Sequence, residues 1–163
     1  MGRILALNTY LSYHNNGQDY QNEPHYFAKE YFSQVDWSAP AYNHMPWVYE
    51  AVKSYTETIA MLRFPDHISK THLNALLQEI PADSRTHQLA MGGMLTGLRT
   101  KQHAHFLPFA KRFVEKYKTT SPNAAAAVEA QIKQMGSMVV GGEAPNFTQK
   151  NPDGEDISLS DFR

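Results

Sequence analysis

The chain contains no cysteine among its 163 residues. Disulfides, thiolate nucleophiles, cysteine-ligated zinc and dithiol redox chemistry are therefore excluded within these residues. An excess of one charge is also lacking, because 15 Lys and Arg oppose 16 Asp and Glu. No long-range field attracts the chain to nucleic acid or anionic lipid, and no apolar run approaches the ~20 residues that span a bilayer. We expect neither a nucleic-acid partner nor a membrane-spanning segment.

The sequence is rich enough in apolar residues, at 42%, to bury a core of domain size. Apolar side chains recur at steps of three and four, which predicts an all-α fold, a bundle of about six helices. The strongest signal runs from Met45 to Leu62. Asn22, Asp66, either Asp83 or Ser84, and Ser121 are candidate N-caps. The six predicted helices cover residues 24–36, 45–62, 66–80, 84–98, 105–117 and 122–136.

Two adjacent glycines, Gly92 and Gly93, lie inside the predicted helix 84–98. Each costs roughly 1 kcal/mol of helix propensity relative to alanine, so their presence needs a reason. The absence of side chains lets a neighbouring helix approach closely, and we favour this explanation over a ligand contact.

The pattern changes after residue 137, where short extended runs flank the turn Asn151-Pro152-Asp153-Gly154. This arrangement predicts a C-terminal hairpin. Because an isolated hairpin is marginal in water, we expect this extended tail to pair as strands only in an intact, longer protein. The predicted organisation is an irregular lead-in over 1–23, a helical domain over 24–137, and the start of a truncated further domain over 138–163.

The tail carries a specific motif that resembles the opening of the TlpA-like and AhpC/TSA thioredoxin-fold proteins. Those families begin with a glycine, Ala-Pro, Phe-Thr, an Asp-Gly turn and Ser-Leu-Ser-Asp-Phe. Gln149 departs from the pattern, because the families usually place an apolar residue there. The matching positions here are Gly141, Ala144, Pro145, Phe147, Thr148, Asp153, Gly154, Ser158, Leu159, Ser160, Asp161 and Phe162.

The resemblance implies that the redox cysteines of such a protein lie beyond Arg163, as Cys-x-x-Cys in TlpA-like oxidoreductases or a peroxidatic cysteine in peroxiredoxins. No catalytic residue and no cofactor are then expected in this chain, which is not an enzyme by itself. Two alternatives stay open: a free-standing helical protein-interaction module, and the upstream region of a peroxiredoxin.

The helical part has a looser likeness, through Pro24-His25-Tyr26-Phe27, Val35-Asp36-Trp37-Ser38, the region of Pro46, and Tyr55. It resembles the N-terminal helical domain of exported Bacteroidetes-type thiol-disulfide oxidoreductases. This implies a periplasmic or exported protein that serves cell redox homeostasis. The expected partners are the C-terminal thioredoxin-like domain of the same protein, a protein or peptide substrate that the helical domain positions, and a second copy in a homodimer.

The eight histidines do not form a metal-binding pattern. His103 and His105 are two residues apart and His67 and His72 are five apart, so neither pair shares a helical face. No metal site is therefore expected. We expect His25 either to donate to a backbone carbonyl or to lie in a small aromatic cluster.

No Gly-x-Ser-x-Gly nucleophile elbow and no phosphate-binding glycine loop occur. The aromatic residues between Tyr26 and Trp47 fit core packing better than an exposed binding surface, which is the alternative.

Overall fold

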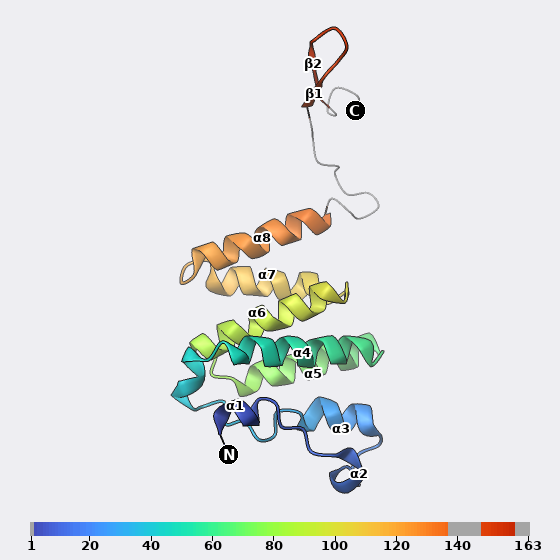
Figure 1. Ribbon diagram of the computed structural model, residues 1–163, viewed down its shortest axis with the longest axis vertical. Helices are drawn as coiled ribbons and strands as arrows, with labels where there is room; N and C mark the ends of the chain where they lie inside the picture. The colour runs from blue at the N-terminus through green and yellow to red at the C-terminus, as the bar shows by residue number, and fades with distance from the viewer. Residues whose placement is uncertain (1, 137–147, 159–163) are drawn as a thin grey trace. The chain divides into compact units, whose positions relative to one another are not determined.

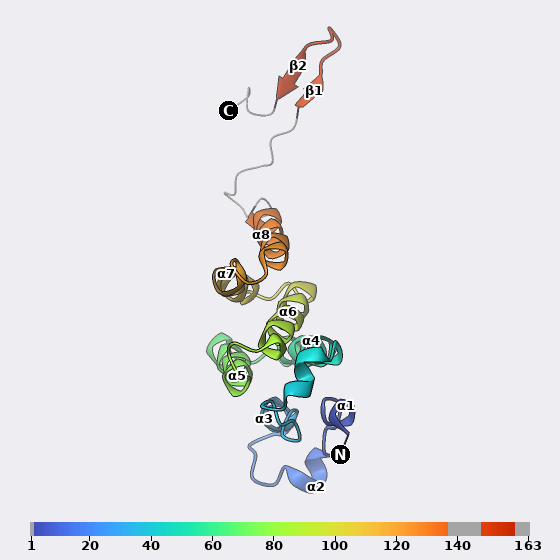
Figure 2. The ribbon, with the colours of Figure 1, turned by 90° about the vertical axis from the view of Figure 1, so that its left-hand side faces the viewer.

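The computed structural model describes residues 2–136 and 148–158. Within this part the chain forms α-helices, one short 3-10 helix and a two-stranded hairpin (Figures 1 and 2). The chain divides into two compact units, Met1–Phe113 and Val114–Arg163. The helices are α1 (Arg3–Ala6), α2 (Tyr13–Asn16), α3 (Glu23–Glu30), η1 (Pro40–His44), α4 (Trp47–Met61), α5 (Asp66–Glu79), α6 (Arg85–Thr100), α7 (Phe106–Tyr117) and α8 (Pro122–Gly136).

The all-α prediction with a C-terminal hairpin is confirmed, and two details are corrected. The lead-in is not wholly irregular, because it contains the single turns α1 and α2. The first long helix ends at Glu30 and not near Asp36. The chain turns after Glu30, and this turn brings the Phe32 ring edge-on to Trp37, with 5.2 Å between the ring centroids.

Side-chain caps fix the starts of two helices as the sequence predicts. The Asn22 side chain accepts a hydrogen bond from the His25 backbone N–H, and Ser84 accepts one from the His87 N–H. The Asn43 side chain of η1 adds an acceptor for the Thr86 N–H. The Asp66 prediction is wrong, because Asp66 is the first residue of α5 and follows Pro65 at the N-cap. Its carboxylate instead lies in the first turn, where the helix dipole favours negative charge.

Helices α4 and α6 form the tightest contact in the first unit. A Cβ atom built on Gly93 would overlap the Tyr49 carbonyl oxygen, and one on Gly97 would lie 2.8 Å from the Lys53 carbonyl oxygen. Glycine is therefore required at both positions for the two backbones to approach. The close-approach explanation is confirmed at Gly93, whereas Gly92 faces only the Tyr49 ring, at 3.3 Å.

Helix α4 has a different neighbour on its other side, where α3 lies (Figures 1 and 2). The Tyr55 hydroxyl donates a hydrogen bond of 2.7 Å to the Ala28 carbonyl oxygen of α3. The Tyr55 ring stacks on Phe27, with 5.7 Å between centroids and 17° between planes. The contact between α3 and α4 is therefore made by aromatic rings rather than by backbone atoms.

Helix α7 begins at Phe106, as Pro108 in its first turn requires. Its predicted apolar stripe is buried in the first unit at Phe106, Phe109 and Phe113. In the second unit, α8 begins at Pro122 and ends at Gly136, as predicted.

The hairpin pairs β1 (Thr148–Lys150) with β2 (Asp156–Ser158) in antiparallel register. Thr148 lies opposite Ser158, and their hydroxyls are 2.8 Å apart. Gly154 adopts φ +85°, the left-handed conformation that the Asp-Gly turn requires of glycine. The expectation that these strands pair only in a longer protein is therefore wrong: within this chain they pair with each other.

Most of the motif resembling thioredoxin-fold proteins lies outside the described residues, and so does the expected domain boundary at 137/138. The positions outside are Gly141, Ala144, Pro145, Phe147, Leu159, Ser160, Asp161 and Phe162. Thr148, Asp153, Gly154 and Ser158 lie inside, in the strands and the turn of the hairpin.

Candidate functional site

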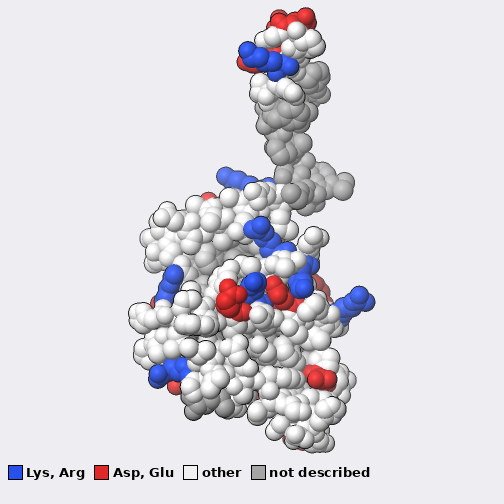
Figure 3. Space-filling view, in the orientation of Figure 1, with Lys and Arg blue, Asp and Glu red and all other residues white. Residues whose placement is uncertain are grey.

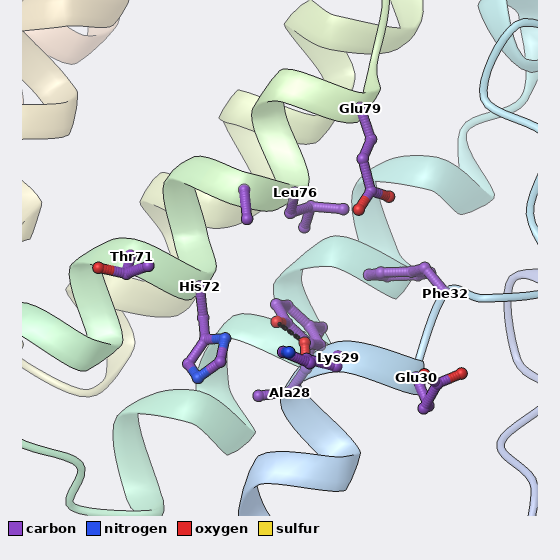
Figure 4. Close-up of a pocket in the computed structure, with 10 residues that line it drawn as sticks. Ala28, Lys29, Glu30, Phe32, Thr71, His72, Leu76 and Glu79 are labelled. Carbon is purple, nitrogen blue, oxygen red and sulfur yellow. Dashed lines mark hydrogen bonds between the residues drawn. The ribbon is translucent and has the colours of Figure 1, made fainter.

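A cavity of about 350 Å³ opens between α3, α4 and α5 (Figure 4). Its size lies at the lower end of the range of small-ligand pockets. Three elements that are distant in sequence build it, all within the first unit. The lining residues are Ala28, Lys29, Glu30, Phe32, Tyr55, Thr71, His72, Ala75, Leu76 and Glu79.

The floor of the cavity is apolar and well buried. Phe32 and Leu76 are 6% and 5% exposed, and the Tyr55 ring packs against Phe32 with 5.2 Å between centroids. The Tyr55 hydroxyl is already bonded to the Ala28 carbonyl oxygen, and burial raises the pKa of Tyr55. The floor therefore offers apolar surface but no free hydroxyl.

One face of α5 supplies most of the wall. His72, Leu76 and Glu79 follow one another at steps of four and three, which places them on one side of the helix. Figure 4 shows His72 and Glu79 at opposite ends of this row, with Leu76 between them. Seven residues at 1.5 Å rise separate the two ends by about 10 Å along the axis.

The first end of the cavity is basic. Burial lowers the pKa of His72, and the nearby His25 and Lys29 charges lower it further. The His72 ring contacts Phe64 and His25, at centroid distances of 5.4 Å and 6.1 Å. His25 thus lies in a small aromatic cluster, as expected, and Lys29 is the cation at this end.

The second end is acidic. Burial raises the pKa of Glu79, and this increase is partly offset by the indole N–H of Trp37. That N–H is buried and has no hydrogen bond of good geometry in the described part of the chain. Glu79 is also the last residue of α5, where the helix dipole disfavours a negative charge.

The third charged residue of the cavity, Glu30, is already engaged, since its carboxylate accepts a hydrogen bond from the Tyr20 hydroxyl. This bond raises the pKa of Tyr20 to about 12. By contrast, within residues 2–136 and 148–158 neither Lys29 nor Glu79 has an ion-pair partner. Within the described ranges the cavity therefore holds one cation and one anion that have no ion-pair partner.

A second histidine cluster lies at the start of α5. The His105 ring Nε2 lies 2.8 Å from the Asp66 carbonyl oxygen and 3.5 Å from its carboxylate, and the His103 Nδ1 accepts the His105 backbone N–H. This cluster ties the α6–α7 loop to α5. In the described ranges, no group of three or more His, Asp or Glu side chains is arranged so that it could hold a metal ion.

The aromatic residues between Tyr26 and Trp47 mostly enter the core, as the sequence favours. Tyr26, Trp37 and Tyr42 are at most 5% exposed, whereas Trp47 is 50% exposed. The cavity could not be found from the sequence, because its lining residues on α3 and α5 are more than forty residues apart and come together only in the folded chain. The available signal was the spacing of His72 and Glu79 on one helix face.

Charged side chains of both signs are interspersed over the face shown in Figure 3, without a large patch of one sign. Among the helices that the structure describes, none is both long and apolar enough to cross a bilayer. Comparisons with protein-family models, curated proteins and solved structures found no match. The likeness to thioredoxin-fold proteins therefore stays a prediction.

Proposed function

We propose that this chain is the non-catalytic helical region of a periplasmic thiol-disulfide oxidoreductase, placed before a thioredoxin-like domain that carries the Cys-x-x-Cys. Its role is to position a substrate or to mediate dimerisation. The observation that carries the proposal is the hairpin of Thr148–Lys150 and Asp156–Ser158, whose Gly154 turn has the left-handed φ that the motif demands. The chain itself has no cysteine, which agrees with a non-catalytic part.

The proposal is tested first on the coding sequence. We expect a Cys-x-x-Cys shortly after the codon for Arg163 and an export signal before that for Met1. A stop codon directly after Arg163 would overturn the proposal in favour of a helical interaction module. A single peroxidatic cysteine would overturn it in favour of a peroxiredoxin.

The second test is enzymatic and uses the full product of that coding sequence. We expect it to reduce insulin disulfides in the presence of dithiothreitol and to lose this activity when both cysteines become serine. The 163-residue chain serves as a matched control and should show no activity. A full product that is folded but inactive would contradict the proposal.

A further inference from the structure

The cavity between α3 and α5 combines three features that together describe a ligand. Its two ends carry opposite charges, Lys29 beside His72 and Glu79 at the other end. Its floor between them is apolar, through Phe32, Tyr55 and Leu76. A ligand that fits has an anionic end, an apolar middle and a cationic end.

The row of α5 residues that runs from His72, next to Lys29, to Glu79 sets the length of the ligand. His72 and Glu79 lie two helical turns apart, about 10 Å along α5. An extended peptide spans at most 3.3–3.6 Å per residue, so a tripeptide covers about this distance from its ammonium to its carboxylate.

Lys29 and Glu79 are available for such a ligand because neither takes part in an ion pair among the described residues, and the neighbouring Trp37 indole N–H leaves the charge of Glu79 unbalanced. Among the described residues, an ion pair joins Lys53 to Glu50, and His105 contacts Asp66, which is an ion pair only when the histidine is protonated; neither contact involves Lys29 or Glu79. The remaining carboxylate at the cavity, Glu30, is occupied by the Tyr20 hydroxyl.

The placement of Glu79 is unfavourable for the free protein. It ends α5, where unsatisfied carbonyl groups repel an anion, and its carboxylate is partly desolvated. Residues that oppose local stability are concentrated at functional sites. The opposite charge of an ammonium group bound at Glu79 offsets both penalties.

We propose that this cavity binds the two free termini of a short apolar peptide of about three residues, with the peptide carboxylate at Lys29 and its ammonium at Glu79. This inference does not rest on the proposed function, because it uses only residues of the first unit and none of the thioredoxin-like motif.

The test titrates the 163-residue chain with the tripeptide Ala-Leu-Ala by calorimetry and by NMR of the labelled protein. We expect saturable binding, with shifts concentrated at Ala28, His72, Leu76 and Glu79. N-acetylation or C-terminal amidation of the peptide removes one charged end. Each should weaken binding about tenfold, as expected for loss of a hydrogen bond to a charged group.

Two variants assign the ends separately. Glu79→Gln should weaken binding of the free peptide about tenfold but leave binding of the N-acetylated peptide unchanged. Lys29→Met should weaken binding of the free peptide about tenfold but leave binding of the C-terminally amidated peptide unchanged. Lys70→Met and Glu129→Gln change exposed residues outside the cavity and serve as matched controls that bind like the unaltered chain.

Three results would overturn the inference: no saturable binding by the folded chain, equal binding of free and capped peptides, or unchanged binding by both cavity variants. Glu79→Gln and Lys29→Met alter side chains at the cavity rim, and circular dichroism reports whether each variant is folded. If either fails to fold, the capped peptides still test the same contacts on the unaltered protein. Failure here leaves the thioredoxin proposal standing, because the coding-sequence test decides that independently.

Discussion

The two sides of α4 show two different ways to hold a helix. Toward α6, glycines bring the backbones into contact, and the Gly97 position leaves only 2.8 Å between a Cβ and the Lys53 carbonyl oxygen. Toward α3 and α5, aromatic rings form a floor and leave a cavity of about 350 Å³ with charged residues at its rim. A contact made of backbone tolerates no added atom, whereas a contact made of side chains leaves room for a ligand.

The difference also separates stability from function in this part of the chain. At its closest points the α4–α6 contact is made with the carbonyl oxygens of Tyr49 and Lys53, which do not titrate. The cavity contains His72 and Glu79, whose pKa values burial shifts in opposite directions. Four predictions test this contrast.

The largest expected effect is that of Gly93→Ala on the α4–α6 contact. The new methyl overlaps the Tyr49 carbonyl oxygen, and we expect a loss of about 2 kcal/mol in the free energy of unfolding, after alanine's gain in helix propensity. Gly92→Ala is the matched control and should be close to neutral, since its methyl meets only the edge of the flexible Tyr49 ring. Urea denaturation followed by circular dichroism measures both. Equal stabilities of the two variants would contradict the backbone-contact account.

The next effect compares hydroxyl groups on the two sides of α4. Tyr55→Phe leaves the buried Ala28 carbonyl oxygen without its donor and should cost about 1 kcal/mol. Tyr49→Phe removes a 2.6 Å hydrogen bond to Thr96, but both groups are half-buried and water can replace the lost partner. We therefore expect a smaller loss, measured by the same urea titration. A larger loss of unfolding free energy for Tyr49→Phe than for Tyr55→Phe would contradict this prediction.

The third effect is a pH dependence at the cavity. Burial and the neighbouring His25 and Lys29 hold the pKa of His72 below its usual 6.5, so the folded state binds its proton less readily than the unfolded chain. The contribution of His72 to the free energy of unfolding is therefore fully present above pH 6.5, and it is lost as the pH falls through the lowered pKa. His72→Asn should flatten the decline in melting temperature between about pH 7.5 and pH 5. The variant His67→Asn, which changes an exposed histidine, is the control and should keep the full decline. If the decline is unchanged in His72→Asn, the titration of His72 is not its cause.

The smallest effect is expected for Glu79→Gln in the absence of ligand. Because burial raises the pKa of Glu79, its charged form is disfavoured in the folded state, and the cost appears as the pH rises above about 4.5. The neutral variant should gain a few tenths of a kcal/mol at pH 7, measured by thermal melting. Near pH 4 the gain should vanish. A loss of stability at pH 7 would show that the carboxylate stabilises the free protein.

Much of the helical fold could be predicted because local chemistry determines it. Asn22 and Ser84 are caps whose side chains accept hydrogen bonds from helix N–H groups, as expected. The glycine pair indicated a close helix neighbour, and Gly93 shows that contact. The error at Asp36 arose because Phe32 and Trp37 come together through a turn, a tertiary contact that periodicity does not report.

The candidate site could not be predicted from the sequence in the same way. Lys29 and Glu79 are fifty residues apart and become neighbours of one cavity only when α3 packs against α4 and α5. The hairpin is the opposite case: its Asn-Pro-Asp-Gly turn is local, and Thr148 and Ser158 pair as the turn length dictates. Its pairing within this chain differs from the expectation that a larger sheet was needed.

The buried indole of Trp37 gives the cavity a built-in optical reporter. The chain has two tryptophans, and the other, Trp47, is 50% exposed to solvent. Trp37 lies beside the Glu79 carboxylate, whose negative charge acts on the indole. Replacing Trp47 with phenylalanine leaves a single tryptophan, whose emission spectrum responds to whatever neutralises Glu79. Occupancy of the cavity can then be followed by fluorescence, without attaching a label to the protein.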